Sequence, residues 1–204
     1  MLDGPAAPGG GAVAAMSIDL TAPWAYRAGV IADPEALFAQ VTEEVDWTDQ
    51  MRARRTASMG RPYNYAGASY PEADWHPAVW QLAERLAPIV NFTPTNCLLN
   101  AYPTGDHRIG WHADDVDILE TGTGIAIISL GAARTIQLRS GSSPDFIYEP
   151  VPLAPGSLFW MSPELQATHR HGIRREPGAG PRVSLTFRRI IRESPVVDRA
   201  RWGS

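Results

Sequence analysis

The second half of the chain consists of short segments that are typical of β-strands, and this feature restricts the possible folds more than any other. Glycines fall between several of these segments, where turns require a permissive backbone. The strands are expected at about 96–102, 109–114, 124–130, 134–139, 145–149, 157–161, 168–173 and 182–190. The sequence shows no internal repeat. Extended structure therefore dominates the chain after residue 96.

Two helices are expected ahead of these strands. The first begins at 33–35, where Asp-Pro-Glu supplies a cap, a first-turn proline and an acidic first turn, and it buries Leu37 and Val41. The second begins near Pro77 and ends before Pro88, with one apolar stripe. That stripe consists of Val79, Leu82, Ala83 and Leu86. Because helices come first and strands follow, the predicted fold class is α+β, with a double-stranded β-helix (jelly roll) core backed by N-terminal helices.

The length and composition predict one domain. A chain of 204 residues with 44% apolar composition can bury a sizeable core. Residues 1–17 are rich in Gly, Ala and Pro and lack the basic start of a secretory signal, so we expect a disordered leader followed by one domain at 18–204. No apolar run reaches about 18 residues, so no membrane helix is expected. Cys97, the only cysteine, is expected to be a buried thiol in a reducing compartment, which agrees with an expected cytoplasmic location. A monomer is also expected.

Every basic side chain apart from histidine is arginine, although the formal net charge is −4. Such a charge argues against a protein that coats nucleic acid, yet local basic rims are compatible with transient phosphate binding. The absence of lysine also fits a bias in genomic composition. The arginines cluster at Arg52, Arg54, Arg55 and Arg61, at Arg170, Arg174 and Arg175, and at Arg188, Arg189 and Arg192.

A metal site is predicted by His112 and Asp114, which flank Ala113 in one expected strand. Residues i and i+2 of a strand project to the same face, so both side chains can hold one ion. His171, from a distant strand, can supply a third ligand. Two imidazoles and one carboxylate form the facial triad of non-heme Fe(II) proteins, although such groups also suit zinc. His169 shares the strand face of His171 and is an alternative ligand.

A second polar face lies on the last expected strand. Arg182, Ser184, Thr186 and Arg188 alternate with apolar residues there. The strand is either an outer one with solvated arginines or one whose arginines face a barrel interior and bind a dicarboxylic acid. Upstream, Leu98, Asn100 and Tyr102 share a face, and an amide and a phenol can orient the same anion.

These motifs, taken in order, resemble the AlkB family of Fe(II)- and 2-oxoglutarate-dependent dioxygenases, which repair alkylated nucleic acid. The resemblance runs from about residue 55 to 190. The matching segments are Asn100-x-Tyr102, His112-x-Asp114-Asp115, Ser129-Leu130-Gly131-Ala132-x-Arg134, Gly156-Ser157-Leu158, His171 and 181–188.

The resemblance implies a set of site residues. His112, Asp114 and His171 would be the iron ligands at the catalytic centre. Arg182 would bind the distal carboxylate of 2-oxoglutarate, and Arg188 the end that chelates iron. The further cosubstrate contacts would be Asn100, Tyr102 and Ser184. Ser184 stands where many members of the family have asparagine, and its hydroxyl can still donate to a carboxylate.

Substrate recognition is expected in the loop 59–67, which is rich in Gly, Pro and Tyr. A base must leave its stack to reach the iron, and aromatic or apolar side chains hold it there. The expected substrate contacts are Met59, Arg61, Tyr63, Tyr65 and Asp115. The two tyrosines could instead fix a lid to the sheet. Asp115 suits cationic bases, whereas Val116 stands where an acidic residue is frequent.

The resemblance implies oxidative demethylation of N-alkylated bases such as 1-methyladenine and 3-methylcytosine in DNA or RNA. Fe(II), 2-oxoglutarate and O2 would be the cofactors, succinate and formaldehyde would be released, and nucleic acid would be the partner. Two alternatives stay open. One is a 2-oxoglutarate-dependent hydroxylase of a protein or small molecule, which the acidic net charge and Val116 favour. The other is a non-catalytic or zinc-binding barrel, against which the arginine pair argues.

Overall fold

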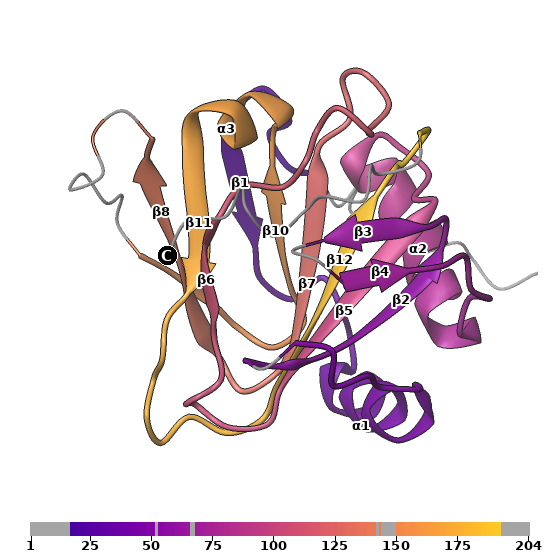
Figure 1. The fold of residues 1–204 in the computed structure, drawn as a ribbon, viewed down its shortest axis with the longest axis vertical. Coiled ribbons are helices and arrows are strands. Elements are labelled where there is room, and N and C mark those ends of the chain that lie inside the picture. The colour runs from indigo at the N-terminus through magenta and orange to yellow at the C-terminus, as the bar shows by residue number, and fades with distance from the viewer. Residues whose placement is uncertain (1–16, 52, 66–67, 142, 144–149, 193–204) are drawn as a thin grey trace, which may run out of the picture.

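The computed structural model describes residues 17–51, 53–65, 68–141, 143 and 150–192, and it has two facing antiparallel sheets (Figure 1). The large sheet has the order β1-β10-β7-β12-β5-β2. These strands are β1 Trp24–Arg27, β10 Ser157–Met161, β7 Ile125–Gly131, β12 Arg182–Arg188, β5 Asn96–Tyr102 and β2 Arg55–Gly60. The small sheet has the order β6-β11-β8-β9. Its strands are β6 Ile109–His112, β11 His169–Ile173, β8 Arg134–Ser140 and β9 Val151–Leu153. The predicted jelly-roll core is confirmed.

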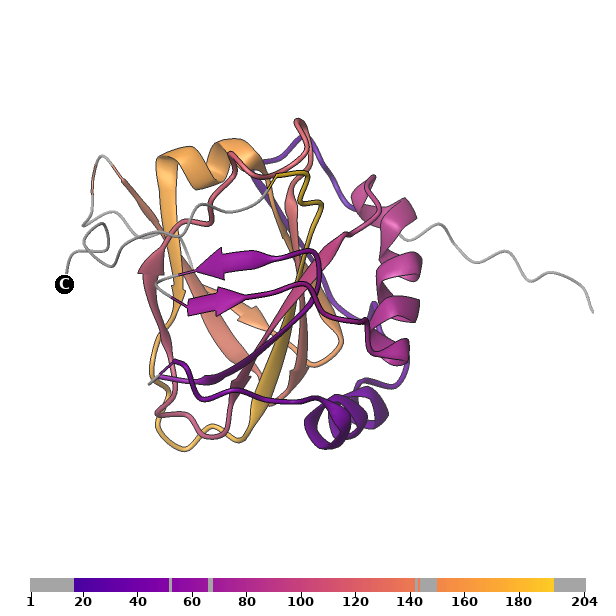
Figure 2. The same cartoon turned by 45° about the vertical axis from the view of Figure 1, so that its right-hand side comes forward.

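Helices cover the outer face of the large sheet, and a hairpin lies across the front of the barrel. Figure 2 shows α1 Pro34–Glu44 and α2 Pro77–Val90 on one side of the molecule, with the hairpin of β3 Tyr63–Tyr65 and β4 Ala68–Tyr70 in front. One apolar core fills the space between the helices and the large sheet. A second core lies between the two sheets and surrounds the candidate site.

The first helix forms where the capping signals predict it. The carboxylate of Asp33 accepts a hydrogen bond from the amide of Ala36 at 2.9 Å, and Pro34 occupies the first helical position. Val41 is buried, whereas Leu37 is only partly buried. The helix therefore starts at the expected residue and packs one narrow stripe against the core.

The second helix does not end before Pro88, so that prediction is wrong. The helix continues to Val90 and ends at Asn91, which adopts the left-handed conformation at φ 59°. A proline in a helix removes one backbone hydrogen bond. Ile89 and Val90 beyond it are buried in the helix-backed core, and their burial favours the additional turn.

The strands from residue 96 onward agree with the predictions to within two residues wherever both are described. The predicted strand at 145–149 lies outside the described residues. The elements that the sequence patterns did not indicate are short: β1, the three strands between residues 55 and 70, β9, and the helix α3 Pro163–Thr168. The predicted leader at 1–17 falls almost wholly outside the described residues and stays a prediction. Within the described chain, no helix is long and apolar enough to cross a membrane.

Candidate metal and cosubstrate site

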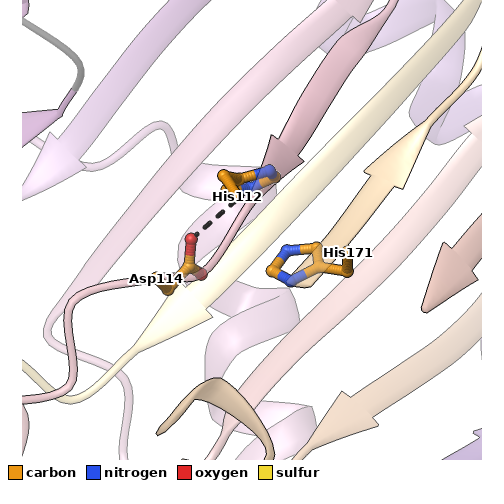
Figure 3. A group of neighbouring side chains, drawn as sticks. All are labelled: His112, Asp114 and His171. Atoms are coloured by element: carbon orange, nitrogen blue, oxygen red, sulfur yellow. Dashed lines mark ion pairs between the residues drawn. The ribbon is translucent and has the colours of Figure 1, made fainter. Parts of the chain in front are cut away.

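Three side chains from β6, β11 and the loop after β6 meet between the sheets. His112 ends β6, and His171 lies directly opposite it on β11 in the strand register. The ligand atoms of His112, Asp114 and His171 all lie within 4.8 Å of one another, and all three residues are buried. Figure 3 shows the three side chains turned toward one another. The structure therefore brings together the three residues that the sequence predicted as metal ligands.

Asp114 reaches this cluster from a loop and not from a strand. The strand β6 ends at His112, and the amide of Asp114 donates to the side-chain oxygen of Gln166 at 2.9 Å. Gln166 lies on α3, which Ser162 caps by accepting from the amide of Leu165. The expectation that His112 and Asp114 share one strand is therefore wrong, although their side chains do lie together.

A backbone contact fixes the orientation of the His112 ring. Its Nδ1 lies 2.9 Å from the carbonyl oxygen of Gly110. A carbonyl can only accept, so Nδ1 carries the proton and Nε2 keeps its lone pair. Nε2 lies 3.6 Å from Oδ1 of Asp114, on the side of the ring that faces the other two groups. This is the tautomer that a metal ligand requires.

The ionisation states also suit a metal. Burial lowers the pKa of His112, and burial together with the neighbouring His112 lowers the pKa of His171 to about 3. Burial alone would raise the pKa of Asp114, but Arg188 and the two histidines outweigh it and hold that pKa below its usual range. Two neutral imidazoles therefore face an ionised carboxylate at neutral pH, the protonation state in which these groups bind metals.

Arg188 is bound to the metal-side carboxylate. Its Nη2 donates to Oδ2 of Asp114 at 2.7 Å, and its guanidinium lies 4.6 Å from the centre of the Tyr63 ring. Burial would lower the pKa of Arg188, but the pairing with Asp114 raises it. Nε and Nη1 have no hydrogen-bond partner among the described residues. One nitrogen of Arg188 therefore binds Asp114, and the other two are available to bind a ligand.

Arg182 lies at the other end of the same strand and forms no ion pair with an acid of the described residues. Its Nη2 donates to the hydroxyl of Ser129 at 2.9 Å, and its guanidinium lies 5.1 Å from the centre of the Tyr102 ring. The residue is buried, yet Nε and Nη1 have no partner among the described residues. Burial lowers the pKa of Arg182, and Arg134 lowers it further, although Tyr102 and Glu176 act in the opposite direction. A buried cation with unpaired donors is costly unless it meets an anion.

The predicted cosubstrate contacts all line the pocket that contains the triad. They are Asn100, Tyr102, Arg182, Ser184 and Arg188. Ser184 lies between Asn100 and Ser129 in the strand register. Thr186 and several isoleucines and leucines form the remaining walls, so the polar groups converge in a largely apolar enclosure. The pocket has a cationic group at each end and the metal-binding cluster at one of them.

Three residues that hold this site were not predicted to do so. Gln166 binds the Asp114 loop, and no pattern in the sequence indicated it. Arg54 is buried and donates from Nε to the Asn100 side chain at 2.6 Å, whereas the sequence placed it in a basic rim. Arg134 is buried near Tyr102 and donates from Nη2 to the carbonyl of His107 at 3.0 Å. Its position in the motif at 129–134 was the available signal.

The predicted substrate residues do not converge on one surface. Met59 is buried in the helix-backed core and does not line the pocket. Tyr63 is 1% exposed, and its ring supports Arg188. Tyr65 lies on β3, with its side chain outside the described part. Arg61 is exposed and donates to the carbonyl of Ile190 at 3.3 Å.

Asp115 and His169 lie beside the triad without joining it. Asp115 is partly exposed, and its Oδ1 accepts from the amide of Asp117 at 3.0 Å. His169 is partly exposed, with Nδ1 at 2.7 Å from the hydroxyl of Thr168. The metal-binding cluster contains His171 and not His169.

Comparison with known proteins identifies the family. The model of the 2OG-Fe(II) oxygenase superfamily matches residues 34–188. The chain is 31% identical over 173 residues to the "Alpha-ketoglutarate-dependent dioxygenase alkB homolog 3" of Mus musculus, covering 76% of this chain and 60% of that protein. It is 29% identical over 182 residues to the "DNA oxidative demethylase ALKBH2" of Mus musculus, covering 78% of this chain and 76% of the relative. This chain therefore belongs to the 2OG-Fe(II) oxygenase superfamily.

The relatives also confirm the predicted resemblance to the AlkB family. Family membership implies Fe(II), 2-oxoglutarate and O2 as cofactors. The chain spans about three fifths of the length of the alkB homolog 3 relatives that it matches. The fold is shared with the structure of OsALKBH1, at 14% identity and a TM-score of 0.58, covering 82% of this chain and 96% of that one.

Proposed function

We propose that this chain is an Fe(II)- and 2-oxoglutarate-dependent dioxygenase that demethylates N-alkylated bases, such as 1-methyladenine and 3-methylcytosine, in DNA or RNA. One observation carries the proposal: a buried His-Asp-His cluster and two buried arginines with unpaired donors line a single pocket. The named activities of the alkB homolog 3 and ALKBH2 relatives support the reaction type.

The cluster fits Fe(II). His112, Asp114 and His171 would hold the ion, since two neutral imidazoles and one carboxylate leave open positions on one face of it. The same groups could bind zinc. A zinc site needs no cation for a dicarboxylate at the far end of the pocket, however, so Arg182 favours iron with an acidic cosubstrate.

The pocket also fits 2-oxoglutarate. Arg182 would bind the distal carboxylate through Nε and Nη1, and Asn100, Tyr102 and Ser184 would orient the cosubstrate. Arg188 would orient Asp114 through one nitrogen and offer Nε and Nη1 to the carboxylate near the metal. When bound, iron and 2-oxoglutarate supply the oxidation that hydroxylates the N-methyl group while releasing succinate and carbon dioxide; the hydroxylated group then leaves as formaldehyde.

The chain's own residues would select the base at the mouth of this pocket. Asp115 is partly exposed beside the cluster, and a carboxylate favours 1-methyladenine and 3-methylcytosine because both are cationic. Arg61 and Tyr65 would contact the substrate strand or base. Tyr63 would act through Arg188, because its ring is buried beneath that guanidinium. Met59 would contribute to the core and not to the substrate contact, which departs from the role expected from the sequence.

The proposed partner is therefore nucleic acid, bound transiently by a monomer. A reducing, cytoplasmic environment is proposed from Cys97, whose thiol is buried and whose pKa burial raises above its ordinary value. The second candidate function is hydroxylation of a protein or small molecule. Val116 favours it, because this residue packs against the inter-sheet core where an acid would otherwise stand near the base.

The test is to incubate the protein with Fe(II), 2-oxoglutarate and oligonucleotides that carry 1-methyladenine or 3-methylcytosine. We expect formaldehyde and succinate to form together, in amounts that rise with the methylated strand. Arg182→Met is the control, because it removes the proposed contact to the distal carboxylate of 2-oxoglutarate and should therefore reduce both products. Succinate without formaldehyde on every oligonucleotide would contradict demethylation and favour the second candidate.

A further inference from the structure

The small sheet has an outer face that the proposed reaction does not use. His112 on β6 and His171 on β11 face the pocket. Because side chains alternate along a strand, the residue next to each histidine in the sequence faces away from the pocket. Trp111 and Arg170 are the outward residues there, Arg139 is outward on β8, and Arg174 follows β11. In Figure 1 this sheet stands opposite α2. We call these four residues the Trp111 face.

Trp111 holds two guanidinium groups in place. Arg139 lies 4.7 Å from the centre of its ring and Arg174 lies 6.0 Å from it. A guanidinium stacked on an aromatic ring keeps its N–H groups free for other partners and has fewer conformations to lose on binding. The tryptophan thus orders the two arginines for an anion and does not offer a bare ring for a base.

The arginines of this face form no ion pairs within the part of the chain that the structure describes. Among the described residues, neither Arg139, Arg170 nor Arg174 takes part in an ion pair, whereas Arg55, Arg134 and Arg189 each do. Arg170 also lies directly opposite Arg139 in the strand register. Like charges in this position are destabilising. The protein has a net charge of −4, yet none of its described acidic groups pairs with these arginines, so an anionic ligand best explains the cluster.

The position of the face indicates which anion this is. Trp111 directly precedes His112, so the face is the reverse side of the strands that carry the candidate metal ligands. A nucleic-acid strand with one base in the pocket extends beyond the pocket on both sides. The phosphates that flank this base carry one negative charge per nucleotide. Planar arginines bind phosphate bidentately, and such contacts position a nucleic acid without reading its sequence.

We propose that the Trp111 face binds the sugar–phosphate backbone of the substrate strand outside the alkylated base. This inference rests on the proposed function, because it assigns the nucleic acid to the same chain and reaction. It makes binding independent of sequence, dependent on salt and dependent on the length of the strand.

The direct test is binding of an unmethylated, fluorescently labelled 20-nucleotide single strand, followed by anisotropy over a range of salt concentrations. The variants are Arg139→Ala, Arg170→Ala, Arg174→Ala and the triple substitution. Because each phosphate contact to a single strand contributes about 0.7 to the salt slope, the triple variant should lose about 2 units of slope. Arg85→Ala is the matched control, since Arg85 is exposed on α2, away from this face.

A second measurement separates this inference from the proposed function. The ratio of kcat/KM on a methylated 20-mer to that on a methylated trinucleotide should fall about tenfold in the triple variant and stay constant in Arg85→Ala. If the triple variant had the same salt slope and the same kcat/KM ratio as the unmodified protein, the inference would be overturned, while the proposed demethylation would be unaffected. Displacement of the oligonucleotide by polyglutamate at equal charge concentration would also overturn it, since the face would then accept any acidic chain. Absence of demethylation with retained, arginine-dependent strand binding would instead contradict the proposed function alone.

Discussion

Both ends of β12 carry an arginine, but the two guanidinium groups have different partners. Arg188 and Arg182 are both buried and both line the pocket. Arg188 donates to the Asp114 carboxylate, whereas Arg182 contacts the Ser129 hydroxyl and the Tyr102 ring and forms no ion pair with an acid of the described residues. A guanidinium paired within the protein contributes to the fold before any ligand arrives. A guanidinium without an acid is a binding group whose charge is to be matched by the ligand.

Of the substitutions considered, Arg188→Met should reduce stability most, because it removes the ion pair between Arg188 and Asp114. The substitution leaves the Asp114 carboxylate buried and uncompensated, and breaking such a pair costs about 3 to 5 kcal/mol. Chemical denaturation should show this loss, while Arg182→Met should cost much less because it leaves no buried carboxylate behind. Equal destabilisation by the two variants would contradict the distinction between the ends.

His171→Ala should abolish turnover and metal binding and should also change how stability depends on pH. The folded-state pKa of His171 is about 3, below its ordinary value, so the unfolded chain takes up a proton that the folded one does not. Stability of the metal-free protein should therefore fall as pH drops below about 6.5, by about 1.4 kcal/mol per pH unit for each such histidine.

The variant should remove one histidine's share of that slope, measured by denaturation between pH 7 and 5. His169→Ala is the control, because His169 is partly exposed and lies outside the cluster. Full turnover in His171→Ala, or an unchanged pH slope, would count against the assigned cluster.

Gln166→Leu should weaken the metal end without touching a ligand. The change leaves the buried amide of Asp114 without its acceptor, and loss of such supporting contacts typically lowers metal affinity about 10- to 100-fold. Titration with Co(II) or Fe(II) under anaerobic conditions measures the effect. Gln40→Leu, on the exposed side of α1, is the control. Metal affinity equal in both variants would show that the Asp114 loop is held by other contacts.

Asp115→Asn should have the smallest effect, confined to the choice of base. The variant should lose activity on 1-methyladenine and 3-methylcytosine relative to a neutral lesion, because only the cationic bases gain from a carboxylate. Asp74→Asn is the control for an exposed aspartate. Equal loss on cationic and neutral lesions, with loss of 2-oxoglutarate decarboxylation in the absence of substrate, would assign Asp115 to the cosubstrate side.

The sequence predicted the barrel interior better than the elements that surround it. Strand alternation placed Arg182, Ser184 and Arg188 on one face, and all three line the pocket. The same rule gave the wrong local structure for Asp114, because a distant side chain, that of Gln166, holds its amide in a loop. Burial of Ile89 and Val90 likewise outweighed the helix-breaking tendency of Pro88. Such long-range contacts leave no periodic signal.

The substrate residues were the least predictable because their loop has no period and its side chains divide between two cores. Met59 enters the helix-backed core, whereas Tyr63 enters the core between the sheets. Different strand pairings determine this division, since Met59 lies on β2, which pairs with β5, and Tyr63 lies on β3, which pairs with β4. Family motifs therefore identified the metal and cosubstrate residues, but packing decides which loop residues reach the pocket.

The most direct test of the contrast between Arg182 and Arg188 is calorimetric titration of 2-oxoglutarate into the Fe(II)-loaded protein without oxygen. Arg182→Met should weaken 2-oxoglutarate binding by about 2 to 5 kcal/mol, as expected for loss of a desolvated charged contact, while its free energy of unfolding without ligands stays close to that of the unmodified chain. Unchanged affinity for 2-oxoglutarate in Arg182→Met would contradict the assignment of the unpaired end as the cosubstrate site.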